Sequence, residues 1–88
     1  MTRTQLVEVM KYQLEGFNST GQAVTEDTVH SDVLSDEGPG TATPKRIYKA
    51  FVRATLVMNG EDDPAWPADW IDLTVGDLAD RLLPGEDL

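Results

Sequence analysis

The sequence predicts a small all-α domain, and three observations lead to this fold class. Apolar residues recur at helical spacing in three segments, residues 3–15, 44–58 and 74–83. A threonine suited to cap a helix opens each segment, and no stretch is long enough to be a convincing strand. The 88 residues are the size of one domain, so we expect a single three-to-four-helix bundle over residues 1–88.

The first helix is predicted from its ends and from its apolar stripe. Thr2 and Gln5 stand at the spacing of a capping box, in which each side chain bonds the backbone N–H of the other residue. Gly16 is expected to end the helix, because glycine is favoured just past a helix C-terminus. The residues expected to face the core are Leu6, Met10 and Leu14.

A long loop, residues 18–42, separates the first helix from the second and is rich in Ser, Thr, Gly and Asp. We expect it to lie across the core through its few apolar residues, and a short helical turn fits residues 25–29. His30 is the one histidine of the chain and is expected to be an ordinary loop residue. The apolar residues of the loop are Val24, Val29, Val33 and Leu34.

The second helix, residues 44–58, has both of its ends marked. Thr43 is a good N-cap, Pro44 suits the first helical position, and Asn59-Gly60 is a left-handed stop signal. One face is apolar at helical spacing, and we expect Ile47 and Phe51 to reach the core. The residues of this face are Ile47, Phe51, Ala54 and Met58.

The last third of the chain predicts a short turn and then a final helix. Prolines in residues 63–71 forbid a long helix there but allow a single turn. We expect Trp66 and Trp70 to pack on the core beside these prolines, with partner binding as the alternative role. A capping-box-like start at Thr74 opens the last helix, whose predicted core residues are Val75, Leu78 and Leu82.

The second helix is basic in an otherwise acidic chain. Residues 44–58 carry +4, whereas the rest of the chain carries −13 and the whole chain −9. Its cations break two local rules, because Lys45 and Arg46 lie in the first turn, where the helix dipole disfavours them, and no acid stands four residues away. We therefore predict a docking face for an acidic surface of a protein partner. The alternative is that the row balances acidic loops of its own domain. The basic residues are Lys45, Arg46, Lys49 and Arg53.

Composition argues against several other functions. Without cysteine and with one histidine, the chain lacks the residues for a zinc site or a histidine-based triad, and its acidic clusters lack the spacing of a calcium loop. We expect no catalysis, no metal and no cofactor. The net charge argues against nucleic acid as a partner, and no apolar run approaches the roughly 20 residues of a membrane span. Glu8 and Lys11 interrupt the N-terminal apolar stretch, so we expect no signal peptide and a cytoplasmic location.

The segment Leu73–Leu83, LTVGDLADRLL, resembles the last helix of acyl carrier proteins and related peptidyl carrier domains. The order of helix, long loop, helix, short helix and helix over about residues 3–83 resembles that family in layout. The resemblance implies an acyl-carrier-like fold. The family attaches phosphopantetheine to a serine at the start of the second helix, and the exposed side of that helix is usually acidic.

Both of these carrier features are missing from this sequence. Residues 38–44 contain no serine, and the second helix is basic. Thr41 and Thr43 lie near the attachment position, but their β-methyl groups fit a site for a primary alcohol poorly, and Thr43 is needed as a cap. The resemblance therefore implies the fold and not the activity.

The first functional hypothesis is a non-catalytic, acyl-carrier-like interaction module without phosphopantetheine. It would dock a protein partner, such as a biosynthetic synthase, through the basic second helix and the adjoining loop, with Trp66 as a further partner-binding residue. A second hypothesis is a small acidic inhibitor, immunity or regulatory protein with an unrelated helical fold. A third is a true acyl or peptidyl carrier with an atypical attachment residue.

Overall fold

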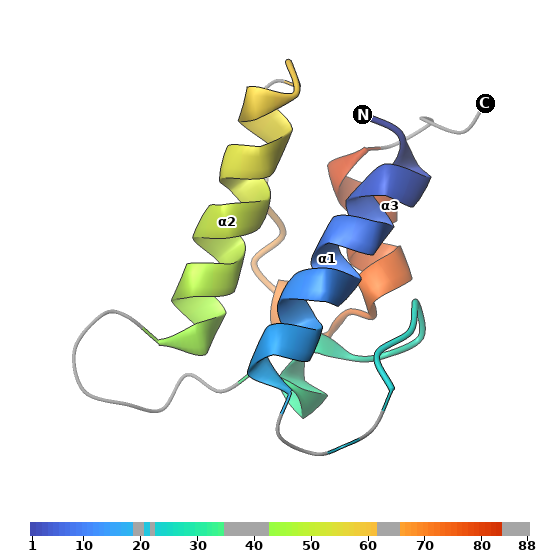
Figure 1. Cartoon of the computed structure of the whole chain (residues 1–88), viewed down its shortest axis with the longest axis vertical. Coiled ribbons are helices and arrows are strands. Elements are labelled where there is room, and N and C mark those ends of the chain that lie inside the picture. Colours follow the sequence, from blue (N-terminus) through green and yellow to red (C-terminus); the bar gives the residue numbers. More distant parts are fainter. Residues whose placement is uncertain (19–20, 22, 35–42, 62–65, 84–88) are drawn as a thin grey trace.

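The computed structural model describes residues 1–18, 21, 23–34, 43–61 and 66–83, which form helices joined by loops and turns (Figure 1). The described part of the chain contains no strand, so the all-α prediction is confirmed. An isolated antiparallel bridge joins Val29 to Thr74. The elements are α1 (Arg3–Phe17), the 3₁₀ turn η1 (His30–Asp32), α2 (Pro44–Met58), the 3₁₀ turn η2 (Trp70–Asp72) and α3 (Val75–Leu82).

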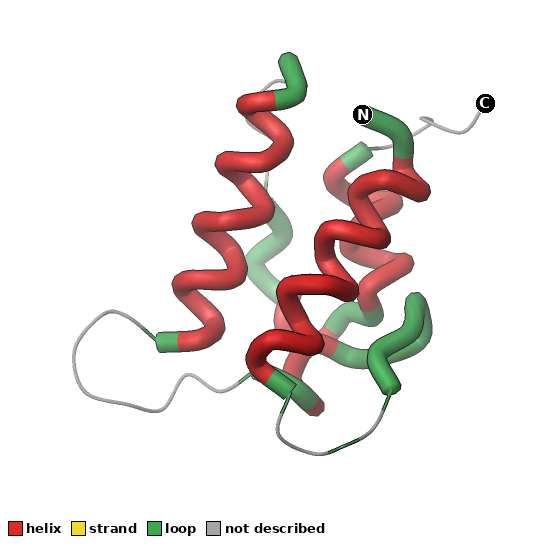
Figure 2. Tube along the Cα trace, in the orientation of Figure 1, coloured by secondary structure: helices red, strands yellow, loops and turns green. Residues whose placement is uncertain are grey.

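Helix α1 is central, because it contacts both α3 and α2. Figure 2 shows α1 and α3 close together, whereas α2 stands at the left edge of the molecule. The loop residues 23–34 gather at the end of the bundle where α3 begins, and η1 contacts η2 there. Helix α2 therefore has one side toward the bundle and a wide outer surface.

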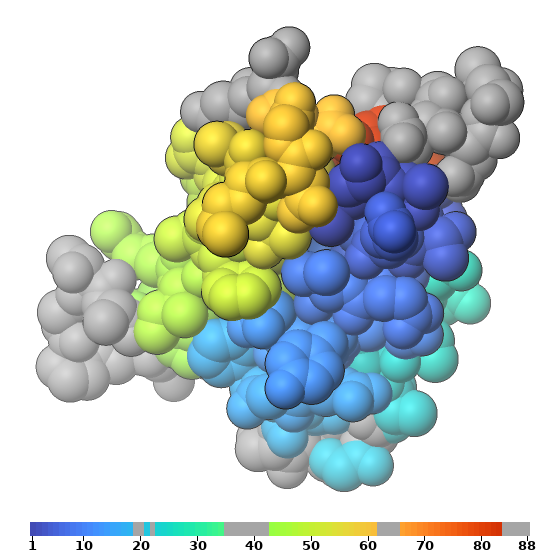
Figure 3. Space-filling view, turned by 45° about the horizontal axis from the view of Figure 1, so that its top comes forward, coloured from blue at the N-terminus to red at the C-terminus, as the bar shows by residue number. Residues whose placement is uncertain are grey.

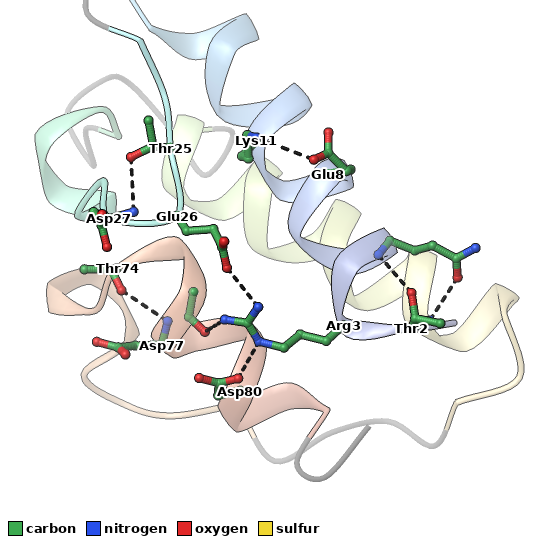
Figure 4. Close-up of polar contacts among 12 residues, drawn as sticks. Thr2, Arg3, Glu8, Lys11, Thr25, Glu26, Asp27, Thr74, Asp77 and Asp80 are labelled. Atoms are coloured by element: carbon green, nitrogen blue, oxygen red, sulfur yellow. Dashed lines mark hydrogen bonds and ion pairs between the residues drawn. The ribbon is translucent and has the colours of Figure 1, made fainter. Parts of the chain in front are cut away.

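The predicted helix starts are confirmed by hydrogen bonds. Thr2 Oγ1 accepts from the Gln5 backbone N–H at 3.1 Å, and the Gln5 side chain accepts from the Thr2 N–H at 2.9 Å, which completes the capping box (Figure 4). Thr43 caps α2 and Thr74 caps α3 in the same way, each accepting from the backbone N–H three residues later.

The helix ends agree with the sequence for α2 but not for α1. Gly60 has a φ of +84°, as a left-handed stop requires. Helix α1 does not end before Gly16, because Gly16 and Phe17 are helical and Asn18 is the C-cap. Phe17 packs against the core. This partial burial of Phe17 favours continuing the helix through Gly16, against the cost of about 1 kcal/mol for a helical glycine.

The core contains the predicted faces of α1 and α3 but not that of α2. Ile47 and Phe51 are 45% and 44% exposed, so their assignment to the core is wrong. Each is replaced inside by the residue that follows it, which corresponds to a rotation of the helix by about 100°. The buried apolar residues on the three helices are Leu6, Val7, Met10, Leu14, Tyr48, Val52, Leu56, Val75, Leu78, Ala79 and Leu82.

The loop and α1 are both tied to the start of α3. The Glu26 and Thr28 carbonyls accept from the N–H groups of Gly76 and Val75, which have no partner inside the helix. Arg3 of α1 forms ion pairs with Glu26 and with Asp80 of α3, and it also donates to the Gly76 carbonyl (Figure 4).

The loop crosses the core as predicted, with Val24 and Leu34 buried. At the helical turn expected near residues 25–29, the structure has a single hydrogen-bonded turn, in which the Thr28 N–H donates to the Thr25 carbonyl, and η1 follows it as a separate element. The turn η2 falls at the end of the predicted segment 63–71, of which residues 63–65 lie outside the described part of the chain.

Candidate functional site

A hollow of about 390 Å³ lies between the first two turns of α2 and the segment around Trp66 and Trp70. Its volume falls within the range of about 300–1,000 Å³ that is common for ligand pockets. Four of the five residues predicted to bind a partner line this one hollow. The lining residues are Lys45, Arg46, Lys49, Trp66, Pro67, Ala68 and Trp70.

One wall of the hollow is cationic. Lys45 and Lys49 are one helical turn apart on α2, and Arg46 lies beside them. The Lys49 Nζ lies 5.8 Å from the centroid of a Trp66 ring, a cation–π distance that links the two walls. No carboxylate in the described part of the chain forms an ion pair with Lys45, Arg46 or Lys49. The wall therefore presents positive charge that the described residues do not neutralise.

The opposite wall is aromatic. Trp66 is partly buried and packs edge-on against Trp70, with ring centroids 5.5 Å apart and planes at 78°. Its indole Nε1 is buried and has no hydrogen-bond acceptor among the residues that the structure describes. A buried donor without an acceptor costs about 1–3 kcal/mol. The indole N–H itself is enclosed by the fold, and the hollow is bordered by the side chain of Trp66, over whose ring Lys49 lies.

Trp70 packs against two buried rings, those of Tyr48 and His30. Tyr48 stacks on Trp70 with centroids 5.7 Å apart and planes at 15°, and His30 meets Trp70 edge-on at 5.4 Å. These contacts connect η1, α2 and η2. The position of the hollow is therefore fixed by core packing.

His30 is fully buried, so its expected role as an ordinary loop residue is wrong. Its Nδ1 lies 2.7 Å from the Leu73 carbonyl oxygen, which can only accept, so Nδ1–H is the donor. Its Nε2 lies 2.9 Å from the Tyr48 hydroxyl and accepts from it. The signal for burial was present in the neighbouring Val33 and Leu34, which were predicted to anchor the loop.

Burial sets the ionisation of this pair. It lowers the pKa of His30, although the hydrogen bond to the Leu73 carbonyl opposes the shift. It also raises the pKa of Tyr48. Both groups are therefore neutral at neutral pH, and the pair acts as a structural connection.

The other predicted site residues lie elsewhere. Arg53 is partly buried one turn beyond Lys49 and does not line the hollow. Thr43 is buried, and its hydroxyl accepts the capping bond from Arg46. Thr41 lies outside the described residues. The predicted row of bases thus divides, with three cations at the hollow and one beyond it.

Helix α2 also exposes an apolar ridge, formed by Ile47, Phe51 and Met58, that was expected to be buried. Met58 is 85% exposed. At about 100° per residue, the ridge and the basic row flank the buried line of Tyr48, Val52 and Leu56 on opposite sides. Figure 3 shows one face of the molecule on which α2, green to yellow, lies against α1 in blue. The outer surface of α2 is therefore apolar along one border and basic along the other.

Within the described residues, no group of three or more His, Cys, Asp or Glu side chains is placed to hold a metal ion. None of the helices in that part of the chain has the length and apolar character needed to cross a membrane.

Comparisons of the chain with protein-family models, curated proteins and solved structures found no match.

Proposed function

We propose that this chain is a non-catalytic protein-interaction module of acyl-carrier-like layout, without phosphopantetheine, that docks a partner through α2. The observation that supports the proposal is the outer surface of α2. It carries the exposed apolar ridge along one border and the cationic hollow along the other.

The exposed apolar side chains concentrate on this one helix. Among the described residues, the large hydrophobic residues that are exposed are Tyr12, Ile47, Phe51, Val57 and Met58, and all but Tyr12 belong to α2. Contiguous exposed apolar surface bordered by polar residues is typical of protein-binding sites. Burying the ridge against a partner would supply affinity through the hydrophobic effect.

The charge of α2 indicates the kind of partner. Its four cations stand in a chain of net charge −9, so an acidic partner is attracted to this helix and repelled by the remainder of the surface. We infer a partner surface with an apolar centre and an acidic border. The resemblance to carrier proteins makes a biosynthetic synthase the first partner class to test.

The absence of phosphopantetheine is supported at Thr43. Its hydroxyl is buried and accepts the capping bond of α2, so a transferase would have to break the helix start to reach it. The order of helices and the contacts of α1 with α2 and α3 are in keeping with an acyl-carrier-like layout.

The proposal is tested with the double variant Lys45→Glu/Lys49→Glu. It should lose capture of partners from the native lysate while its melting temperature stays near that of the parent, and added salt should slow association of the parent. The matched control is Lys11→Glu/Arg81→Glu, which changes the net charge equally at exposed or partly exposed positions away from α2.

The alternative, in which the row balances acidic loops of its own domain, predicts a different outcome. The double variant would then melt lower by a modest amount, because surface ion pairs contribute about 0–1 kcal/mol each. A variant that melts lower and still captures its partner would show that the row is structural and that the docking proposal is wrong.

A further inference from the structure

We propose that the hollow between α2 and Trp66 is a carboxylate pocket, which receives an acidic side chain of the docked protein. The carboxylate would lie against Lys45 and Lys49, beside the ring of Trp66. This inference rests on the proposed docking function and specifies which chemical group of the partner is recognised and where.

The hollow concentrates positive charge at short range. Three cations from the first two turns of α2 line the hollow, and no carboxylate of the described residues pairs with any of them. A carboxylate entering here gains charge-assisted hydrogen bonds, which are shorter and stronger than those between neutral groups. A neutral guest would gain no such bonds, and a cationic guest would be repelled.

The ring of Trp66 lies next to the cations. The Lys49 Nζ is 5.8 Å from the centroid of a Trp66 ring, so a carboxylate that pairs with Lys49 lies close to the indole. The indole N–H signal of Trp66 therefore reports a carboxylate in the hollow.

The rest of the lining is largely apolar. Trp66, Pro67, Ala68 and Trp70 supply apolar surface next to the cations. Such walls favour a carboxylate carried on methylene groups, as in glutamate, over a bare inorganic anion. Trp70 is held by its stacking on Tyr48, so this wall is preorganised and binding requires little reordering.

The test is a titration of the whole chain, labelled with ¹⁵N, with a blocked glutamate–leucine–glutamate peptide. The matched peptide carries glutamines in place of both glutamates, and inorganic phosphate is the third probe. The chain has two tryptophans, so its spectrum contains two indole N–H signals, which a Trp66→Phe variant assigns. The Trp66 signal should shift to saturation with the glutamate peptide, because a carboxylate binds beside its ring.

Two variants localise the effect. The variant Lys45→Gln/Lys49→Gln should bind the glutamate peptide about tenfold or more weakly than the parent. The variant Lys11→Gln/Arg81→Gln, with the same change in net charge, should bind it within about twofold of the parent. A thermal melt of each variant shows that the fold is retained. The glutamine peptide should not move the Trp66 signal.

Three results would overturn the carboxylate pocket. They are no movement of the Trp66 signal, equal weakening by the two charge variants, and binding of phosphate as tight as that of the glutamate peptide. None of these results depends on partner capture. The docking proposal would fail separately, if Lys45→Glu/Lys49→Glu still captured the partner.

Discussion

The Nε2 atom of His30 lies 2.9 Å from the Tyr48 hydroxyl, and this buried hydrogen bond joins the loop between α1 and α2 to the first half of α2. The same histidine is held at its other ring nitrogen by the Leu73 carbonyl, just before α3. One side chain thus connects the loop with two segments that are distant from it in the sequence. This connection makes the rotation of α2, and the hollow beside it, depend on a neutral histidine.

The first prediction is a loss of stability at mildly acidic pH. The folded state lowers the pKa of His30, so it favours the neutral ring. The stability from this ring is complete above its unfolded pKa of 6.5 and is lost as the pH falls below that value toward the folded pKa. The free energy of unfolding should decline by up to about 1.4 kcal/mol per pH unit in that window.

Thermal or urea unfolding between about pH 8 and pH 5, above the range in which ordinary carboxylates titrate, measures this effect. The control is His30→Gln. This variant should be less stable than the parent at neutral pH, but its free energy of unfolding should not decline between about pH 8 and pH 5. A parent protein whose stability is flat down to pH 5 would contradict the assignment of a buried neutral histidine.

The second prediction concerns the partner of His30. Tyr48→Phe keeps the stacking on Trp70 but leaves Nε2 of His30 buried without its donor. Such a loss costs about 1–3 kcal/mol. In a domain of this size each kcal/mol lowers the melting temperature by about 4–8 °C, which calorimetry resolves. Tyr12→Phe is the matched control, because Tyr12 is exposed. The melting temperature of this variant should stay within error of the parent.

The third prediction separates the two apolar faces of α2. Leu56→Ala removes a fully buried side chain and should cost about 2–5 kcal/mol. Phe51→Gln, at a position that is nearly half exposed, should cost about 1 kcal/mol or less. Urea unfolding of both variants shows which face contributes more to the free energy of unfolding. If Phe51→Gln were the more damaging change, the orientation of α2 described above would be incorrect.

The fourth prediction is that the chain does not accept phosphopantetheine. After incubation with a phosphopantetheinyl transferase and coenzyme A, its intact mass should be unchanged, because Thr43 is buried and committed to capping. A carrier protein with the usual serine, treated in parallel, verifies that the transferase is active. The gain of one phosphopantetheine on any hydroxyl would replace the interaction-module hypothesis with that of an atypical carrier.

The sequence by itself determined where the helices begin and much of what they bury. The caps at Thr2, Thr43 and Thr74 are bonds between residues three apart, so the information is local and can be recognised in a linear sequence. The core faces of α1 and α3 were also predictable, because each offers one apolar stripe opposite polar residues. Three of the five residues predicted to bind a partner, Lys45, Arg46 and Lys49, lie at one hollow for a related reason, since their spacing sets them on one side of a helix.

Only the tertiary structure decided the rotation of α2 and the role of His30. The sequence of α2 contains two apolar stripes, one through Ile47 and Phe51 and one through Tyr48 and Val52, and local patterning cannot rank them. The stripe through Tyr48 and Val52 is buried because Tyr48 bonds to His30 and stacks on Trp70, which are 18 and 22 positions away in the sequence. Contacts at such separations depend on how the whole chain packs, and the same packing leaves the first stripe outside and places Trp66 opposite the lysines.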